Sequence, residues 1–203
     1  MIPDRPSGPA RGTLQWTLPR ARELLVVCAV LGLAQALGPV VNSALRYDRA
    51  ALASGQWWRL WSAHVVHLGW DHFALNVAGL VGLWWLYVTQ ATRRQWIIVA
   101  FISAAFISAA LYVANPEVQW YVGLSGVLHA LWAAAALAMW RRSRTESIAA
   151  LALLGAKLAW EYFVGPLSSG GNTALVVITA AHRYGAVAGL GCAAALRLWR
   201  EPL

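Results

Sequence analysis

The sequence predicts an all-α membrane protein with six transmembrane helices and both termini in the cytoplasm. The chain has 203 residues, of which 60% are hydrophobic and only 12% are charged. A soluble domain of this composition would expose one large apolar patch. A bilayer span needs roughly 20 mostly apolar residues, and the chain has room for about six. The basic residues also cluster at the ends of apolar runs, as orientation signals do.

The N-terminal residues 1–22 carry proline, glycine and arginine ahead of the first apolar run, and we predict a cytoplasmic segment. Residues 23–200 are predicted to form one six-span domain, because the spans leave no room for a soluble module. The first span is expected at about 24–41 and ends at Gly38-Pro39. No small-residue cleavage site follows it promptly, which favours an uncleaved span over a signal peptide.

A long connection, 42–63, follows the first span and contains the cluster Trp57-Trp58-Arg59-Leu60-Trp61. Amphipathic aromatic residues of this kind belong at the headgroup level of a bilayer. The connection is therefore predicted to lie in the membrane interface.

Five further apolar runs complete the predicted bundle, with breaks at Asn115-Pro116 and Gly165-Pro166. The expected spans are about 71–88, 96–114, 125–140, 148–164 and 175–198. Cys28 and Cys192 lie inside apolar runs, so they are interpreted as small core residues and not as a disulfide.

The distribution of arginine orients the predicted spans. One set of ends holds Arg5, Arg11, Arg20, Arg22, Arg93, Arg94, Arg141, Arg142, Arg144, Arg197 and Arg200, and the other holds Arg46, Arg49 and Arg59. The larger set faces the cytoplasm. Because it includes the arginines near both termini, both termini are predicted to be cytoplasmic, which requires an even number of spans. The net charge of +8 does not indicate nucleic-acid binding, because no basic helix face with interleaved aromatic residues occurs.

Several polar side chains lie inside predicted spans, where each is costly and needs a reason. Three pairs are four residues apart and so share a helix face. They are His72 with Asn76, Ser125 with His129, and Lys157 with Glu161. A fourth group, His182, shares a face with Gly185 and Gly189, and small residues let membrane helices approach closely.

Together these residues indicate hydrolytic chemistry. A serine hydroxyl needs a base within hydrogen-bond reach to become a nucleophile, and histidine can take and return that proton near neutral pH. Charge on a carbonyl oxygen needs preset donors. Ser125, His182 and the pair His72 and Asn76 all lie near the extracytoplasmic ends of their spans. The pattern is that of a serine hydrolase inside a bilayer.

Each of these features also has a structural interpretation. Serine is a common helix cap, Asp71 could cap the helix that carries His72, and Asn76 could bond a neighbouring helix. A histidine on a glycine face can be a satisfied core residue. Lys157 and Glu161 could simply neutralise each other across one helical turn.

The residues resemble the rhomboid family of intramembrane serine proteases. Three motifs occur in the family's order: His72 through Asn76, then Gly123-Leu124-Ser125-Gly126, then Ala181-His182 with Gly185 and Gly189. Trp58-Arg59 also looks like the family's loop motif. The resemblance covers about residues 57 to 190.

Within the family the chain looks most like the rhombosortase group. The features are His129 after the serine motif, Trp57-Trp58-Arg59-Leu60, and Lys157-Leu158-Ala159-Trp160-Glu161 with Gly165-Pro166. This resemblance implies a multi-pass protease of a bacterial inner membrane, active toward the extracytoplasmic side. Its substrates would be membrane-tethered exported proteins with a C-terminal Gly-Gly pair, a hydrophobic helix and a basic end. These would be released or transferred.

The resemblance also implies roles for individual residues. Ser125 would be the nucleophile and His182 the general base and acid, with no acidic third member. His72 and Asn76, with the backbone N–H of Ser125, would form the oxyanion site. We expect His129 to pack against His182. Contact with substrate or tuning of the site is assigned to His129, Lys157, Glu161 and Gly126.

Arg183 departs from the family pattern, in which a small or apolar residue follows the histidine. Two other functions stay open. One is a catalytically inactive rhomboid-fold protein that binds transmembrane helices. The other is a haem or metal protein in which His64, His67, His72 and His182 gather, since His64 and His67 have a plausible ligand spacing. For the protease, no cofactor and no metal is expected.

Overall fold

The structure is a computed structural model that describes residues 12–166 and 177–198. These residues are mostly α-helical, with one pair of short strands. The elements are α1 (Gly12–Ala36), α2 (Gly38–Leu45), β1 (Tyr47–Asp48), α3 (Arg49–Ala53), α4 (Arg59–Ser62), α5 (Trp70–Tyr87), α6 (Arg93–Ala114), β2 (Trp120–Tyr121), α7 (Ser125–Ala138), α8 (Arg144–Phe163) and α9 (Thr179–Ala195), with short 3-10 turns at Val88–Gln90 and Met139–Arg141.

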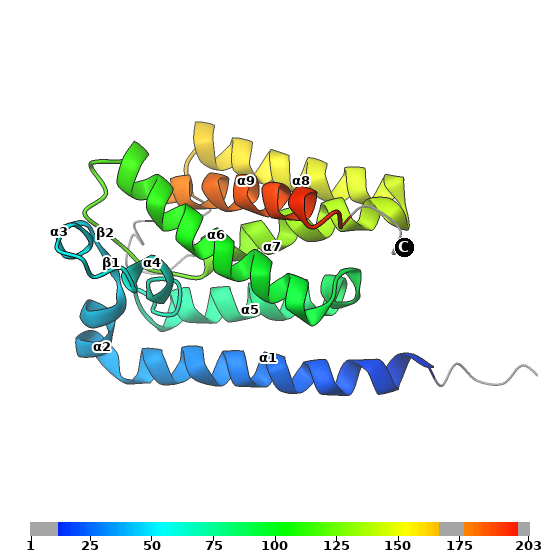
Figure 1. The fold of residues 1–203 in the computed structure, drawn as a ribbon, viewed down its shortest axis with the longest axis horizontal. Coiled ribbons are helices and arrows are strands. Elements are labelled where there is room, and N and C mark those ends of the chain that lie inside the picture. The colour runs from blue at the N-terminus through cyan, green and yellow to red at the C-terminus, as the bar shows by residue number, and fades with distance from the viewer. Residues whose placement is uncertain (1–11, 167–176, 199–203) are drawn as a thin grey trace, which may run out of the picture.

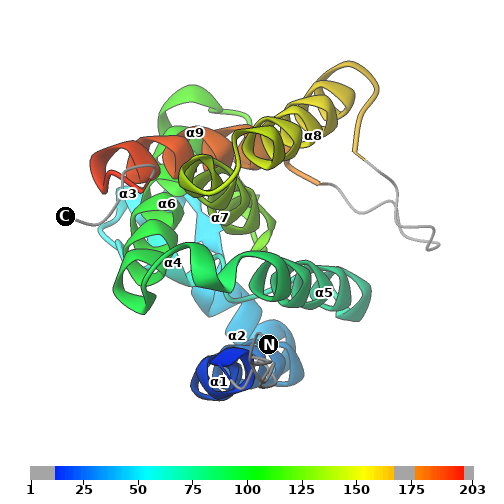
Figure 2. The ribbon, with the colours of Figure 1, turned by 90° about the vertical axis from the view of Figure 1, so that its right-hand side faces the viewer.

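The long helices run side by side along the longest axis of the molecule (Figure 1). Helix α7 is central and packs against α5, α6, α8 and α9. Helix α1 lies on the outside of the bundle, next to α5 (Figure 2). The interior of α7 is rich in alanine, and Ala130, Ala133 and Ala134 have no exposed surface. These small side chains allow several helices to surround α7 closely.

The helices agree with the predicted spans to within a few residues, except at the first. There the chain bends by 110° between Ala21–Ala36 and Gly38–Leu45. The predicted break at Gly38-Pro39 is confirmed, but the helix before it ends at Ala36 and not at 41. Gly38 has a φ of 75°, and Pro39 cannot donate a hydrogen bond back to the preceding turn. The two residues together redirect the chain. The predicted span at 175–198 begins outside the described residues. Residues 1–11 of the predicted N-terminal segment also lie outside them.

Two of the described helices are long and apolar enough to cross a membrane, Trp70–Gln90 and Arg93–Ala114, and the bent pair gives a third candidate. The other three long helices differ in length or charge. Helix α7 has 14 residues and α9 has 17, which is short for a span. Helix α8 carries Arg144, Glu146, Lys157 and Glu161. The protein is therefore an integral membrane protein, and its described residues contain two or three candidate spans by these criteria.

The connection between α2 and α5 is folded. Arg59 ties it to the end of α2, and Arg49 holds it to the bundle at α6. Arg59 donates from Nη1 to the carbonyls of Ser43 (3.0 Å) and Arg46 (2.7 Å). Arg49 donates from Nη2 to the carbonyls of Leu111 (3.0 Å) and Asn115 (2.8 Å) at the end of α6. A positive charge at the C-terminus of α6 also interacts favourably with the helix dipole.

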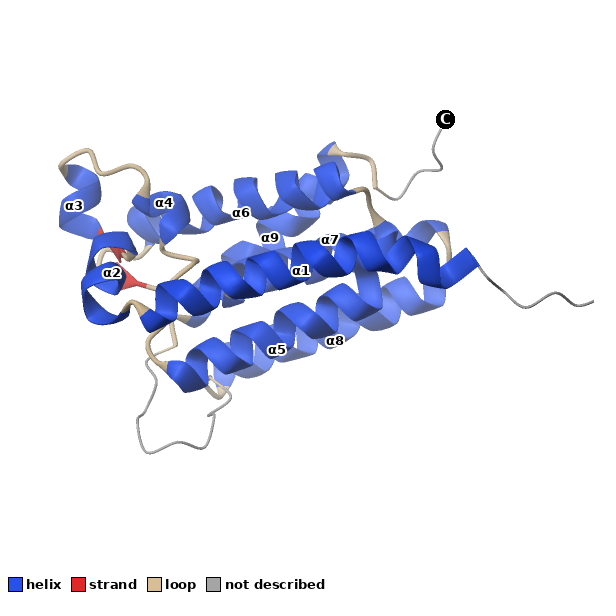
Figure 3. Cartoon of the chain, turned by 90° about the horizontal axis from the view of Figure 1, so that it is seen from below, coloured by secondary structure: helices blue, strands red, loops and turns tan. Residues whose placement is uncertain are grey.

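The two short strands join this connection to the segment that precedes α7. Tyr47 pairs with Tyr121 and Asp48 with Trp120 in an antiparallel ladder. The strands lie at the same end of the bundle as α2, α3 and α4 (Figure 3). They therefore fix the backbone just ahead of Ser125.

The glycine face predicted on α9 is a close helix contact. A Cβ added at Gly185 would overlap the carbonyl of Gly126, and one at Gly189 would overlap the carbonyl of Ala130. The prediction of close approach is confirmed, and the partner is α7. This contact sets the distance between the helices that carry Ser125 and His182.

His67, in the connection before α5, is buried with 1% of its surface exposed. Its ring packs in T-shaped arrangements with His72 and Phe73 at centroid distances of 5.3 and 5.7 Å. Among the described residues, neither ring nitrogen has a hydrogen-bond partner. Burial, with a smaller contribution from His72, lowers the pKa of His67 to about 4.

We expect the protein to lose stability as the pH falls from 6.5 toward 4. His67 stays neutral in the folded state, whereas an unfolded histidine begins to bind a proton near pH 6.5. This linkage costs on the order of 3 kcal/mol over that range. In thermal unfolding of the protein in detergent, His67→Phe should lose less stability than the wild type between pH 7 and pH 5. Equal losses in the two proteins would contradict the assignment.

Candidate active site

Ser125 is the first residue of α7 and follows a turn whose geometry is fixed on both sides. Gly123 has a φ of 122°, and its N–H donates to the carbonyl of Ala63 (3.0 Å). The Tyr121 hydroxyl donates to the carbonyl of Gly123 (2.8 Å). Glycine tolerates this left-handed backbone, so the sequence before the serine permits the turn that aims it.

His182 lies on α9 and reaches Ser125 across the glycine contact. Its Nε2 is 2.8 Å from Ser125 Oγ, and the residue is 4% exposed. A serine and a histidine separated by 57 residues are thus within hydrogen-bond distance.

Glu161, on α8, contacts the opposite edge of the same imidazole. Its Oε2 is 2.8 Å from His182 Nδ1. The expectation that no acidic residue accompanies the histidine is therefore wrong. The sequence marked Glu161 as a costly charge inside a span, but nothing in the sequence places α8 beside this edge of α9.

Lys157 completes a chain of four side chains. Its ammonium donates from Nζ to Glu161 Oε1 over 2.6 Å, which confirms the predicted pairing across one helical turn. Glu161 thus uses one carboxylate oxygen for Lys157 and the other for His182. The Glu161 side chain is only 4% exposed.

These contacts fix the tautomer of His182. A carboxylate paired with an ammonium can only accept hydrogen bonds, so Nδ1 of His182 carries the hydrogen. Nε2 then presents its lone pair to the hydroxyl of Ser125. In this state the histidine can accept the serine proton.

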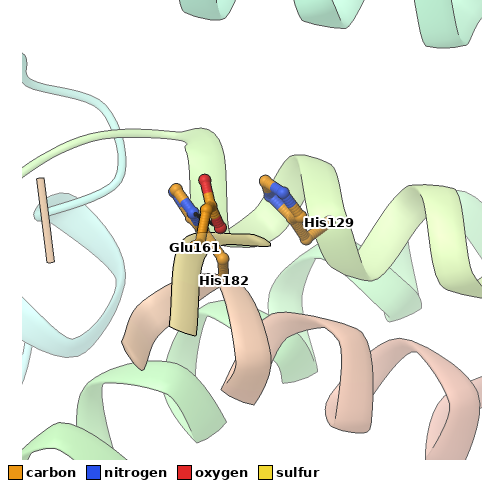
Figure 4. A group of neighbouring side chains, drawn as sticks. All are labelled: His129, Glu161 and His182. Atoms are coloured by element: carbon orange, nitrogen blue, oxygen red, sulfur yellow. Dashed lines mark hydrogen bonds and ion pairs between the residues drawn. The ribbon is translucent and has the colours of Figure 1, made fainter. Parts of the chain in front are cut away.

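His129 lies parallel to His182, one turn beyond Ser125 on α7. The two rings are 4.2 Å apart between centroids with an interplanar angle of 12°, which confirms that His129 packs against His182. His129 Nδ1 is 2.7 Å from the carbonyl oxygen of Ser125 and must donate to it. Figure 4 shows how the side chains of His129, Glu161 and His182 converge from three helices.

His72 and Asn76 lie on α5 in different environments. A Cβ added at Gly123 would lie 2.6 Å from His72 Cε1, so the His72 ring packs directly on the turn before Ser125. Asn76 donates from Nδ2 to the carbonyl of His72 (2.8 Å). In the described part of the chain, Asn76 therefore bonds its own helix and not a neighbouring one. The residue that precedes α5 is Gly69, and no side chain caps the helix, so the interpretation of Asp71 as the cap is wrong.

A cavity of about 440 Å³ opens beside Ser125. It lies between the start of α5, the segment around β2 and the residues before α9. Its described lining consists of Leu68, His72, Glu117, Val118, Gln119, Trp120, Tyr121, Val122, Ser125, Val177 and Ile178. Ser125 and His72 thus share one cavity, and Asn76 is not among its lining residues.

Gly126 and Arg183 follow Ser125 and His182 in the sequence, but their contacts lie away from the pair of Ser125 and His182. A Cβ at Gly126 would lie 3.0 Å from the carbonyl oxygen of Ala181, so Gly126 is part of the contact between α7 and α9. The guanidinium of Arg183 lies over the ring of Tyr162, 5.2 Å from its centroid. The cation next to His182 in sequence is therefore directed toward α8.

The histidines proposed as a metal or haem site do not form one cluster. His64 Nε2 is 3.0 Å from the carbonyl of Ala104 and 3.2 Å from Ser108 Oγ. In the part of the chain that the structure describes, one group has the spacing of metal ligands: His129, Glu161 and His182. Lys157 already contacts the carboxylate of that group.

Comparisons with known proteins assign the family. A rhomboid domain model matches residues 54–199, which is more than half of the chain and includes every predicted site residue. No curated protein matches the chain. The matched region contains Ser125 and His182 in contact, on helices of an integral membrane bundle. The chain therefore belongs to the rhomboid family.

Proposed function

We propose that this protein is an intramembrane serine endopeptidase with Ser125 as nucleophile and His182 as general base and acid. The observation that carries the proposal is the 2.8 Å contact between Ser125 Oγ and His182 Nε2, in the tautomer that can accept a proton. Membership of the rhomboid family supports it, because that family generally consists of serine proteases that act on membrane proteins within the bilayer.

The proposed topology has six spans in residues 23–200, with both termini and residues 1–22 in the cytoplasm. The start of α6, with Arg93 and Arg94, and the α7–α8 connection, with Arg141 and Arg142, lie at the same end of the bundle as the start of α1 and the end of α9 (Figure 1). A shared basic end supports a cytoplasmic assignment.

The length of α7 supports a nucleophile below the membrane surface. Fourteen helical residues extend about 21 Å, whereas the hydrocarbon core is about 30 Å thick. If the arginine end of α7 is at the cytoplasmic surface, Ser125 lies about 9 Å inside the opposite one. The cavity beside Ser125 would admit water from that extracytoplasmic side.

In the proposed reaction, the proton of Ser125 passes to His182 Nε2 as Oγ bonds to the scissile carbonyl carbon. The carbonyl π electrons move to oxygen. When the tetrahedral intermediate collapses, the C–N bond breaks and His182 gives its proton to the leaving amine. Water, or another acceptor amine, then attacks the acyl-enzyme with His182 again as base.

The oxyanion would be held by the backbone N–H of Ser125 together with His72 and Asn76. His72 lines the same cavity as Ser125. Asn76 uses one amide hydrogen for the His72 carbonyl and has a second to donate. A well-placed donor of this kind supplies about 3–4 kcal/mol to the transition state.

The proposed substrates are membrane-anchored exported proteins with a C-terminal tail of a Gly-Gly pair, a hydrophobic helix and a basic end. This proposal rests on the sequence features shared with the rhombosortase group, and it includes a bacterial inner membrane as the location. A catalytically inactive protein that binds transmembrane helices is the alternative, but the contact between Ser125 and His182 favours catalysis.

Labelling with a serine-directed fluorophosphonate tests the nucleophile. We expect the purified protein to be labelled in detergent, and Ser125→Ala to show no label because the reacting oxygen is gone. Ser43→Ala, which removes an exposed hydroxyl, should be labelled like the wild type. Labelling that survives Ser125→Ala would refute the mechanism, and an unlabelled wild type would favour the inactive alternative.

A further inference from the structure

We propose that Glu161 is a positioning residue for His182 and that Lys157 is the counter-ion that keeps Glu161 ionised. The inference rests on the proposed function and deepens it. In this proposal, the active site is a hydrogen-bonded chain of four side chains from α7, α8 and α9: Lys157, Glu161, His182 and Ser125.

Each side chain of this hydrogen-bonded chain is within hydrogen-bond distance of the next. The distances are 2.6 Å from Lys157 Nζ to Glu161 Oε1, 2.8 Å from Glu161 Oε2 to His182 Nδ1, and 2.8 Å from His182 Nε2 to Ser125 Oγ. Both edges of the imidazole are thereby occupied. The ring can neither flip nor change tautomer without losing a charge-assisted hydrogen bond.

Burial makes this arrangement consequential. The side chains of Glu161 and His182 are 4% and 6% exposed, so water screens their interaction little. A lone carboxylate in this setting would be costly and would tend to take up a proton. Lys157, whose side chain is 24% exposed, offsets that cost from the edge of the site and leaves Glu161 as an acceptor.

The same carboxylate stabilises the imidazolium that forms when Ser125 attacks. Glu161 keeps its own proton count during the reaction, because the proton moves only between Ser125, His182 and the leaving group. Polar and charged groups surround His182 from several neighbouring helices. These are Ser125 and His129 on α7, Glu161 with Lys157 on α8, and His72 on α5, while its neighbour Arg183 is directed to Tyr162.

Glu161→Gln tests the proposal through the rate of fluorophosphonate labelling, measured from pH 5 to pH 9. The amide keeps the shape of the side chain, but its NH₂ can donate to Nδ1 and stabilise the wrong tautomer. We expect labelling at pH 7 to slow by about 10²-fold or more, toward the roughly 10⁴-fold loss that follows from a wrong tautomer in a serine triad. The acidic limb of the pH profile should also move to lower pH by about 1 unit, because the imidazolium loses its anionic neighbour.

Two further variants separate positioning from folding. Glu161→Asp keeps the carboxylate and should restore part of the rate and the wild-type position of the acidic limb. Lys157→Met should give a rate between those of the wild type and Glu161→Gln. The double variant should be no slower than Glu161→Gln alone, because Lys157 acts through Glu161.

Glu146→Gln is the matched control, because Glu146 lies exposed near the start of the same helix. It should leave the rate and the pH profile unchanged. A wild-type rate and profile in Glu161→Gln would overturn the inference while the wild type and Ser125→Ala still test the proposed function. A slower rate with an unmoved acidic limb, not restored by Glu161→Asp, would assign Glu161 a structural role and also overturn it.

Discussion

Replacing His182 with alanine is expected to reduce peptide cleavage by about 10⁴-fold or more. The imidazole of His182 is the base that the described structure places 2.8 Å from Ser125 Oγ. Without it the serine proton loses its acceptor and the leaving amine loses its acid. The substrate for this measurement is a membrane-anchored reporter in proteoliposomes. Its C-terminal tail carries a Gly-Gly pair, a hydrophobic helix and a basic end, and cleavage is followed by release of the soluble part.

Residues that act as one unit give losses that do not add. The double variant with Ser125→Ala and His182→Ala should therefore be no slower than either single variant. Arg183→Ala is the adjacent control, and it should cleave like the wild type because its guanidinium lies on Tyr162. Cleavage by His182→Ala at the wild-type rate would contradict the mechanism.

The same reporter tests the substrate proposal separately. Replacing its Gly-Gly pair with Val-Val should reduce cleavage by the wild-type protein, and uncut reporter in both forms would contradict the proposed tail. A labelled but reporter-inactive protein would be a serine hydrolase of this fold with other substrates.

Replacing Gly189 with alanine is expected to lower the stability of the folded protein by about 3 kcal/mol, the upper part of the usual range for overpacking. The added Cβ would overlap the carbonyl of Ala130, which is helix backbone and cannot rotate away. Helices α7 and α9 must then move apart, and the contact between Ser125 and His182 must lengthen. Thermal unfolding in detergent measures the first effect, and the fluorophosphonate labelling rate measures the second.

Gly191→Ala provides the matched control on the same helix. Apart from its own helix backbone, no described atom lies within 4 Å of a Cβ added there, and alanine favours a helix over glycine by up to about 1 kcal/mol. This variant should be as stable as the wild type or slightly more stable. If Gly189→Ala unfolds at the same temperature as Gly191→Ala, the helices are not in the contact described here.

Local patterns in the sequence predicted the helices well because each pattern depends on neighbouring residues. Helices α5, α6, α7 and α8 end close to the proline, glycine or arginine residues that bound the apolar runs in the sequence. The bend at Gly38-Pro39 shows the limit: both residues predicted a break, but only the structure gives the direction in which the chain continues. The strand pair between Tyr47 and Tyr121 was not predicted, because residues 74 positions apart have no shared local pattern.

The candidate site divides in the same way. The glycine face on α9 indicated close packing, and the family motifs named Ser125, His182, His72 and Asn76. Glu161 had a local partner in Lys157 at four-residue spacing, and that pairing was predicted. Its bond to His182 joins two helices whose relative rotation depends on all the packing around α7.

The sequence by itself determined that the protein is a helical membrane protein of the rhomboid type, with a serine and a histidine on separate helices. Composition, helix-face spacing and motif order carry that information because they are properties of short segments. Only the tertiary structure decided that Glu161 and Lys157 extend the serine–histidine pair into a hydrogen-bonded chain of four side chains. Side-chain contacts between helices depend on their depth and rotation, which are set by backbone contacts such as those of Gly185 and Gly189.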